Sequence, residues 1–160
     1  MSEPVSEPVS ALMRSRRRDE SGTALIEFSW LAIVLLVPML YIVLAVFEVQ
    51  RSAFAVSAAA RAAGRAYAVA PSEASGMDRA RGAAAVAFAD QGVEVGRSQV
   101  VITCRPQPGN CLAPGSVIDV DVAYPVNLPL LPAALGGNIP SIRVEAAHSV
   151  PYGTFREDRP

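Results

Sequence analysis

An uninterrupted apolar run extends from Phe28 to Phe47 and reads FSWLAIVLLVPMLYIVLAVF. It contains no charged residue, and Ser29 is its only plainly polar one. About twenty residues rising about 1.5 Å each span about 30 Å, which matches the hydrocarbon thickness of a bilayer. A chain of 160 residues rarely builds a core that surrounds a helix apolar on every face. The pattern therefore predicts a transmembrane helix, to which we assign residues 23–48.

The helical pattern continues beyond the apolar run. Residues 49–69 are good helix formers apart from one glycine. Val56, Ala60, Ala63 and Tyr67 recur at helical spacing and give this stretch one apolar face. We expect this face to cover the sheet of the same chain and favour that over direct packing against another subunit.

A second helix is predicted from Met77 to about Asp90, with Ser75 as its N-terminal cap and Gly92 after its end. The apolar residues at helical spacing form its buried stripe: Met77, Ala80, Ala84 and Phe88.

The period of the apolar positions then changes to two, which is typical of strands. Strands are predicted at Val100–Cys104, Val117–Tyr124 and Ser141–Val150, and the proline-broken stretch 127–140 is predicted to be an irregular packed loop. The fold class is therefore α+β: a single N-terminal transmembrane helix continuing into a long helix, then a second helix and a small antiparallel meander. Residues 49–151 would form one extracytoplasmic domain, and residues 152–160 a loose tail.

Composition and charge suit a single-pass membrane protein with one small domain, because 51% of the residues are hydrophobic and 18% are charged. A net charge of −1 gives no overall electrostatic footprint for nucleic acid. Arg14 and residues 16–18 form a basic cluster before the apolar run, which favours a cytoplasmic N-terminus and an outer C-terminal domain.

Cys104 and Cys111 both lie beyond the apolar run. If this part of the chain lies outside the cytoplasm, a disulfide is the natural interpretation. The alternatives are two unpaired thiols or a metal pair that lacks ligands, and one histidine, His148, is too few for a structural zinc site.

Other polar residues do not form a catalytic pattern. Asp119 and Asp121 are spaced to lie on the solvent face of one strand, where Arg143 could pair with them across strands. No serine has a nucleophile-elbow context, and no glycine-rich stretch matches a phosphate loop. We therefore expect no enzymatic activity, no metal and no cofactor.

The junction before the apolar run carries the most specific signal. Gly22 follows the basic cluster, and Glu27-Phe28 stands at the start of the run. A carboxylate in the first turn of a membrane helix also has an ordinary explanation, since the helix dipole favours negative charge there.

With this junction and the helix that follows it, the chain resembles TadE-like proteins of the tight-adherence (Flp-type) pilus systems, in the type IV pilin-like superfamily. The resemblance covers about residues 14 to 70 well and the C-terminal domain only in outline. Pro38 lies deeper in the span than the proline of many members of that superfamily.

The resemblance implies that a prepilin peptidase removes residues 1–22 by cutting between Gly22 and Thr23. Glu27 and Phe28 would then be assembly residues, with Glu27 of one subunit neutralising the new amine of another. The implied function is a minor pilin-like subunit, or pseudopilin, of a pilus or related secretion machine in the cytoplasmic membrane. Its partners would be the prepilin peptidase, other pilin-like subunits and the pilus assembly machinery.

Two other hypotheses remain open. One is an uncut, signal-anchored protein whose outer domain binds a ligand or an envelope partner. The other is a domain released by secretory cleavage near Ala60, although the apolar run is longer than a usual signal peptide.

Overall fold

The computed structural model describes residues 9–127 and 141–159, with side chains from residue 24 onward except at residue 97. The chain divides into two compact units, one ending at Val43 and the other beginning at Leu44. The predicted loop at 127–140 lies outside the described residues except for Asn127.

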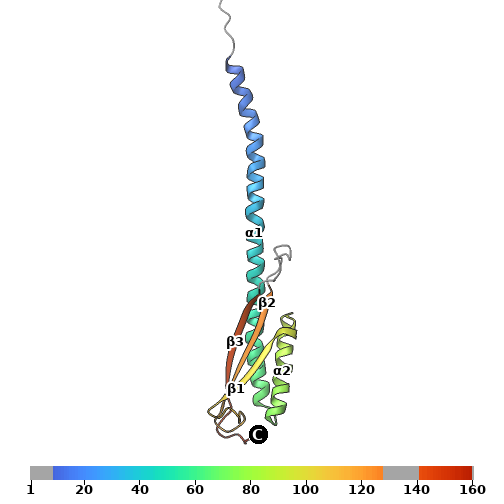
Figure 1. Ribbon diagram of the computed structural model, residues 1–160, viewed down its shortest axis with the longest axis vertical. Coiled ribbons are helices and arrows are strands. Elements are labelled where there is room, and N and C mark those ends of the chain that lie inside the picture. Colours follow the sequence, from blue (N-terminus) through green and yellow to red (C-terminus); the bar gives the residue numbers. More distant parts are fainter. Residues whose placement is uncertain (1–8, 128–140, 160) are drawn as a thin grey trace, which may run out of the picture. The chain divides into compact units, whose positions relative to one another are not determined.

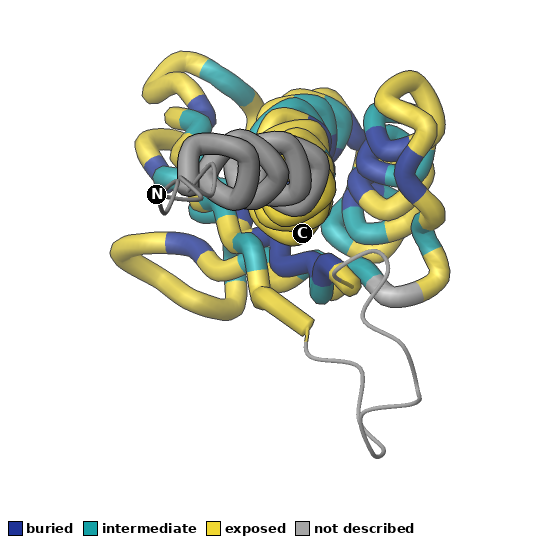
Figure 2. Tube along the Cα trace, turned by 90° about the horizontal axis from the view of Figure 1, so that it is seen from above, coloured by how far each residue is buried: buried dark blue, intermediate teal, exposed yellow. Residues whose placement is uncertain are grey.

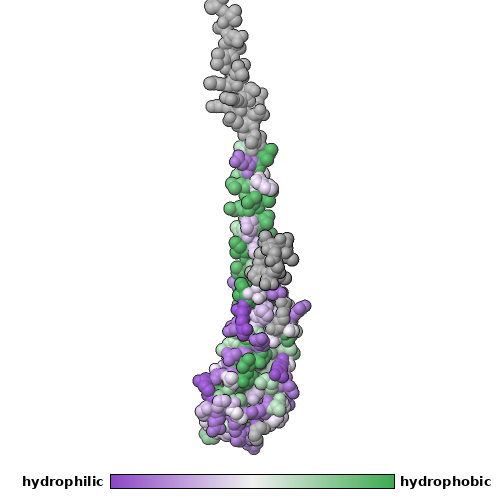
Figure 3. Space-filling view, in the orientation of Figure 1, coloured by the Kyte–Doolittle hydropathy of each residue, from purple (hydrophilic) through white to green (hydrophobic). Residues whose placement is uncertain are grey.

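Helix α1 extends from Val9 to Ala68 and contains Pro38 (Figure 1). Between Leu25 and Phe47 its large apolar side chains are exposed, and Figure 3 shows hydrophobic surface along this stretch. The portion Ala24–Ala68 is long and apolar enough to cross a membrane. The prediction of one apolar helix of spanning length near the N-terminus is confirmed.

The second unit adds helix α2 (Glu73–Asp90), the short 3₁₀ helix η1 (Val95–Arg97) and three strands. The strands are β1 (Gln99–Arg105), β2 (Val117–Asn127) and β3 (Ser141–Pro151), arranged antiparallel in the order β1-β2-β3. The α+β class and the three predicted strands are therefore confirmed.

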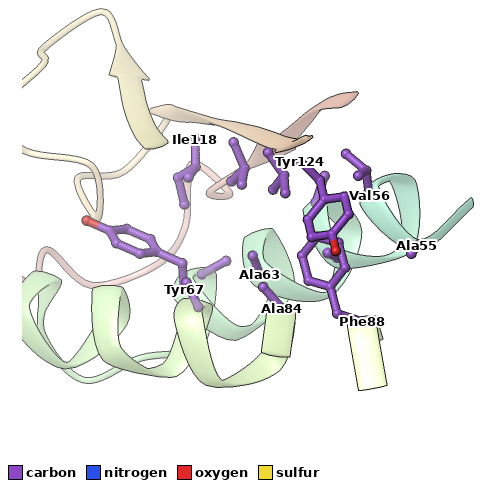
Figure 4. Close-up of a cluster of buried hydrophobic side chains, with 14 of the residues drawn as sticks. Ala55, Val56, Ala63, Tyr67, Ala84, Phe88, Ile118 and Tyr124 are labelled. Atoms are coloured by element: carbon purple, nitrogen blue, oxygen red, sulfur yellow. The ribbon is translucent and has the colours of Figure 1, made fainter. Parts of the chain in front are cut away.

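The core of this unit lies between one face of the sheet and the two helices (Figures 2 and 4). Helix α1 contributes small residues, α2 contributes Phe88, and β2 contributes its alternate residues. The Phe88 and Tyr124 ring centroids are 5.5 Å apart, with the rings tilted by 35°. The predicted apolar face of α1 is fully buried in this core: Val56, Ala60, Ala63 and Tyr67.

Gly64 sits where α1 passes closest to the sheet. A Cβ atom at this position would lie 2.7 Å from Cγ2 of Val150 and 3.5 Å from Cγ2 of Val120. Glycine costs about 1 kcal/mol relative to alanine inside a helix, so its presence here reflects the close approach of β3 and not helix propensity.

The start of α2 differs from the prediction. The N-terminal cap is Ser72 and not Ser75, and the helix begins at Glu73, four residues before Met77. Ser75 instead occupies the third helical position and completes a capping box with Ser72. Serine is suited to these two positions because its hydroxyl group can form hydrogen bonds with the free backbone N–H groups of the first turn.

The C-terminal residues also differ from the prediction of a loose tail. Tyr152 is fully buried, and its hydroxyl donates a hydrogen bond of 2.9 Å to the carbonyl oxygen of Glu157. The guanidinium groups of Arg156 and Arg159 donate to the carbonyl oxygens of Ala68 and Ala70, at 3.0 and 3.2 Å. Carbonyl groups at a helix C-terminus lack intrahelical partners and attract cations, so these arginines fix the tail to the end of α1.

Candidate functional site

The four residues singled out at the junction all lie within α1. Gly22 and Thr23 belong to its continuous helical backbone, and Glu27 and Phe28 follow them. Glu27 is exposed, and Phe28 is 71% exposed. Thr23 and Glu27 are four residues apart, so they lie on the same side of the helix, one turn from each other.

Ser29, two residues after Glu27, has its hydroxyl group satisfied within the helix. The Ser29 hydroxyl donates a 2.8 Å hydrogen bond to the carbonyl oxygen of Leu25 in the preceding turn. This internal bond lets a serine lie at the start of an apolar helix without needing water. Among the described residues, Glu27 takes part in no ion pair.

The two cysteines meet at the far end of the domain from Leu44. The Cys104 and Cys111 sulfur atoms lie at disulfide distance, with Cα atoms 5.2 Å apart, and both residues are buried. The backbone N–H of Cys111 donates to the Glu73 carboxylate, which ties the disulfide loop to the start of α2. The cysteine pair predicted from the sequence is brought together, and its surroundings indicate a structural role.

The outer face of the sheet carries the acidic residues. Asp119 pairs with Arg105, whose Nε and Nη2 atoms lie 2.7 and 3.1 Å from the two carboxylate oxygens. These bonds hold the pKa of Asp119 below its usual value, and a hydrogen bond from Ser149 adds to the effect. The prediction that Arg143 pairs with Asp119 or Asp121 is wrong, because Arg143 pairs with Glu145 on its own strand.

The register explains this change of partner. Arg143 stands opposite Pro125, whereas Thr103 and Ser149 stand opposite Asp119. Arginine at 143 is therefore too far along the sheet to reach Asp119, and Arg105, two residues beyond Thr103, reaches it diagonally. No sequence pattern predicted this register, because it depends on how β2 pairs with both β1 and β3.

An open depression lies on the same outer face, lined by small and charged residues. Its lining comes from all three strands: Gln99, Val101, Asp121, Val122, Ala123, Arg143, Glu145, Ala146 and Ala147. Val101 is 53% exposed here. In the part of the chain that the structure describes, Asp121 forms no ion pair.

His148 lies on the opposite face of β3 and is half-buried against Gly64. No group of three or more metal-ligating side chains is found among the described residues.

The sequence did not predict the hydrogen bonds that Glu73, Arg156 and Arg159 form at the end of the domain that holds the disulfide. The available signal for the tail was an aromatic residue, Tyr152, directly after a strand and followed by two arginines. That combination is compatible with a packed end, but it does not specify which carbonyl groups the arginines reach.

Comparisons of the chain with protein-family models, with curated proteins and with solved structures found no match.

Proposed function

We propose that this chain is a minor pilin-like subunit that is inserted in the cytoplasmic membrane and takes part in assembling a tight-adherence-type pilus or a related secretion machine. The observation that carries the proposal is the construction of α1. One helix contains Gly22, Glu27 and Phe28, then an exposed apolar stretch, and then a buried face of an α+β domain. An assembly subunit needs these three parts in this order.

The proposed role of Glu27 is electrostatic. Cleavage after Gly22 would leave a free ammonium group on Thr23, beside lipid. A charge near the bilayer centre costs about 2.5–3.5 kcal/mol on insertion scales, and less towards the interface. Pairing Glu27 of one subunit with this ammonium group of another offsets part of that cost and fixes the register between the two helices.

The proposed topology places the N-terminus in the cytoplasm and the domain outside. The basic cluster before the apolar run supports this orientation. The cysteine pair at disulfide distance supports it independently, because disulfides persist in oxidising compartments.

The test is the intact mass of the protein extracted from membranes. We expect a mature N-terminus at Thr23. Gly22→Leu should abolish the cut and leave membrane insertion intact, since the apolar run is unchanged. Glu27→Leu should still be inserted and cut, but it should cross-link less to partner subunits. A Gly22→Leu protein that still begins at Thr23 would contradict the proposal.

A second candidate is an uncut, signal-anchored protein whose outer domain binds an envelope partner. The observation that favours it is the unbroken helical backbone across Gly22 and Thr23. A peptidase must unwind the chain around the bond that it cuts, and each lost helical hydrogen bond opposes this local opening. The same mass measurement separates the candidates, since this one predicts a full-length chain.

A further inference from the structure

Two surfaces of the domain carry side chains of opposite charge, and each surface includes a charge that forms no ion pair among the described residues. The first is the arginine stripe, defined as Phe54, Ala58, Arg61, Arg65 and Val69 on α1. The second is the acidic depression, defined as Val101, Asp121, Glu145 and Ala147 on the outer face of the sheet. Arg143 also lines it and is paired with Glu145. Among the described residues, neither arginine of the stripe forms an ion pair, and neither does Asp121.

The arginine stripe lies on the side of α1 away from the core. At 100° per residue, Arg65 falls about 180° around the helix from the buried Val56, and Phe54 and Arg61 fall close to it. Ala58 is half-buried, and the other residues of the stripe are exposed, including the large apolar side chain of Phe54, which is 67% exposed. The acidic depression also faces away from α1, because α1 packs on the other face of the sheet. The two surfaces therefore lie on different sides of the domain and are unable to meet within one copy.

The two surfaces lie at the same level along α1. A Cβ atom at Gly64 would lie 3.5 Å from Cγ2 of Val120 in β2 and 3.6 Å from Cδ2 of His148 in β3, so these three residues lie at one level along α1. The start of β2 lies at the C-terminal end of α1, since Tyr152 bonds Ser116 while Arg156 bonds Ala68. The helix and β2 thus run in opposite directions.

From the level of Gly64 and Val120, Arg61 and Asp121 are both displaced towards the N-terminal end of α1, by similar distances. Arg61 lies three residues before Gly64, or about 4.5 Å along the helix. Asp121 lies one residue after Val120, or about 3.4 Å along the strand in the same direction. Copies that stand side by side with parallel α1 helices would therefore bring Arg61 of one beside Asp121 of the other without a shift along the helix.

The second charge on each surface lies away from this pair. Arg65 lies about one turn after Arg61, towards the C-terminal end of α1. Glu145 lies in the other direction from Asp121, because Asp121 stands opposite Ala147 and β3 runs antiparallel to β2. Glu145 also has a partner of its own, Arg143. Val101 adds exposed apolar area to the depression, as Phe54 and Val69 do to the stripe.

We propose that the domain binds a second copy of this chain through an unshifted, side-by-side contact between the arginine stripe of one copy and the acidic depression of the next. The inference rests on the proposed function, because it names the partner and the contact by which subunits would associate in the membrane plane. Each copy offers both surfaces, so the contact is heterologous and generates a ring or a row, not a closed two-fold dimer.

The test uses thiol cross-linking of the full chain in membranes. Ala58→Cys places a thiol on the stripe and Ala147→Cys places one on the depression, while all charges stay in place. A short bismaleimide should join a tagged Ala58→Cys copy to an untagged Ala147→Cys copy. The double variant should give a ladder of species larger than dimers. Arg81→Cys, on the exposed side of α2, replaces Ala58→Cys in the matched control and should give no product with Ala147→Cys.

Exchanging the charges of Arg61 and Asp121 then tests whether this ion pair holds the two copies together. Arg61→Glu should reduce the cross-linked yield at least tenfold, and Asp121→Arg in the same chain should restore most of it. An absent ladder, a ladder that Arg61→Glu leaves unchanged, or dimers formed by Ala58→Cys alone would each overturn the proposal. The intact mass, which shows where the chain begins, separates this contact from the proposed function. A chain that begins at Thr23 but gives no ladder refutes only the contact. A ladder from an uncut chain refutes only the processing.

Discussion

Helix α1 has two apolar segments that differ in the size of their side chains. From Leu25 to Phe47 the segment consists mainly of Leu, Ile, Val and Phe, and its large side chains are exposed. From Ala55 to Ala70 the buried residues are mostly alanines, together with Val56, Gly64 and Tyr67. Both segments are apolar, but among the described residues only the second contains fully buried side chains.

The difference follows from what each segment touches. Lipid adapts to any side-chain shape, so a span gains most from large apolar groups. A helix that packs on a sheet and on another helix has to let their backbones approach, and small side chains permit this. Gly64 beneath Val150 is the extreme case. Side-chain size, and not hydrophobicity alone, therefore separates the part of α1 that is suited to a membrane from the part that belongs to the domain.

The largest expected effect comes from placing charge in the first segment. Leu36→Arg with Leu40→Arg should raise the free energy of insertion by about 5–7 kcal/mol, from about 2.5–3.5 kcal/mol for each central arginine. We expect the protein to leave the membrane fraction on alkaline extraction. Ala58→Arg with Ala62→Arg has the same spacing in the second segment and should leave membrane retention unchanged. Equal loss in both variants would contradict the distinction between the segments.

The second prediction concerns the domain alone. Replacing Cys104 and Cys111 by serine should lower the free energy of unfolding of the domain by about 2.5 kcal/mol, from the chain entropy of so short a loop. Total stability of a small domain is typically about 5–15 kcal/mol, so the effect is large. Limited proteolysis of the protein in membranes would measure it as faster cleavage after β1. Membrane retention should stay the same, and its loss would indicate that the span depends on the domain.

Much of this architecture could be predicted from the sequence, because its signals are local. The apolar run, the helical spacing of Ala80, Ala84 and Phe88, and the alternation around Val120 each specify an element by its own residues. The spacing of the cysteines with prolines and a glycine between them also favoured a reversal that brings the two together.

The features that could not be predicted depend on contacts between distant residues. Asp119 pairs with Arg105 and not with Arg143, because strand register decides which diagonal neighbour is within reach. The tail is fixed because Arg156 finds a helix end that lies 88 residues earlier. At the junction, the roles of Gly22 and Glu27 come from a resemblance in the sequence and not from contacts within the fold.

The third prediction tests the close approach at Gly64. Gly64→Ala gains about 1 kcal/mol of helix propensity, but its Cβ atom would lie 2.7 Å from Val150, whose branched side chain is stiff. We expect a net destabilisation of about 1–2 kcal/mol in thermal unfolding of the detergent-solubilised chain. In a Val150→Ala background the same substitution should become stabilising.

Gly82 provides the matched control for this prediction. It lies inside α2, and a Cβ atom there would meet nothing within 4 Å. Gly82→Ala should therefore stabilise the domain by about 0.5–1 kcal/mol. If Gly64→Ala behaved like Gly82→Ala with Val150 present, the close approach of β3 to α1 would not explain the glycine.

The smallest effect concerns pH and is confined to the domain. Hydrogen bonds from Arg105, and secondly from Ser149, lower the pKa of Asp119 in the folded state. A carboxyl group with a depressed folded pKa contributes its stability above its unfolded pKa of about 3.9, and loses it as the pH falls through the folded value. Asp119→Asn should therefore lower stability slightly at pH 7 and reduce the further loss seen on acidification below about pH 4. The effect is small because the Arg105 side chain is 71% exposed, where solvent screens the pair. Thermal unfolding between pH 7 and pH 3 would measure it.

Arg105→Gln should reproduce most of the change, and the double variant should add little to either one. Additive effects of the two substitutions would show that Arg105 does not cause the shift at Asp119.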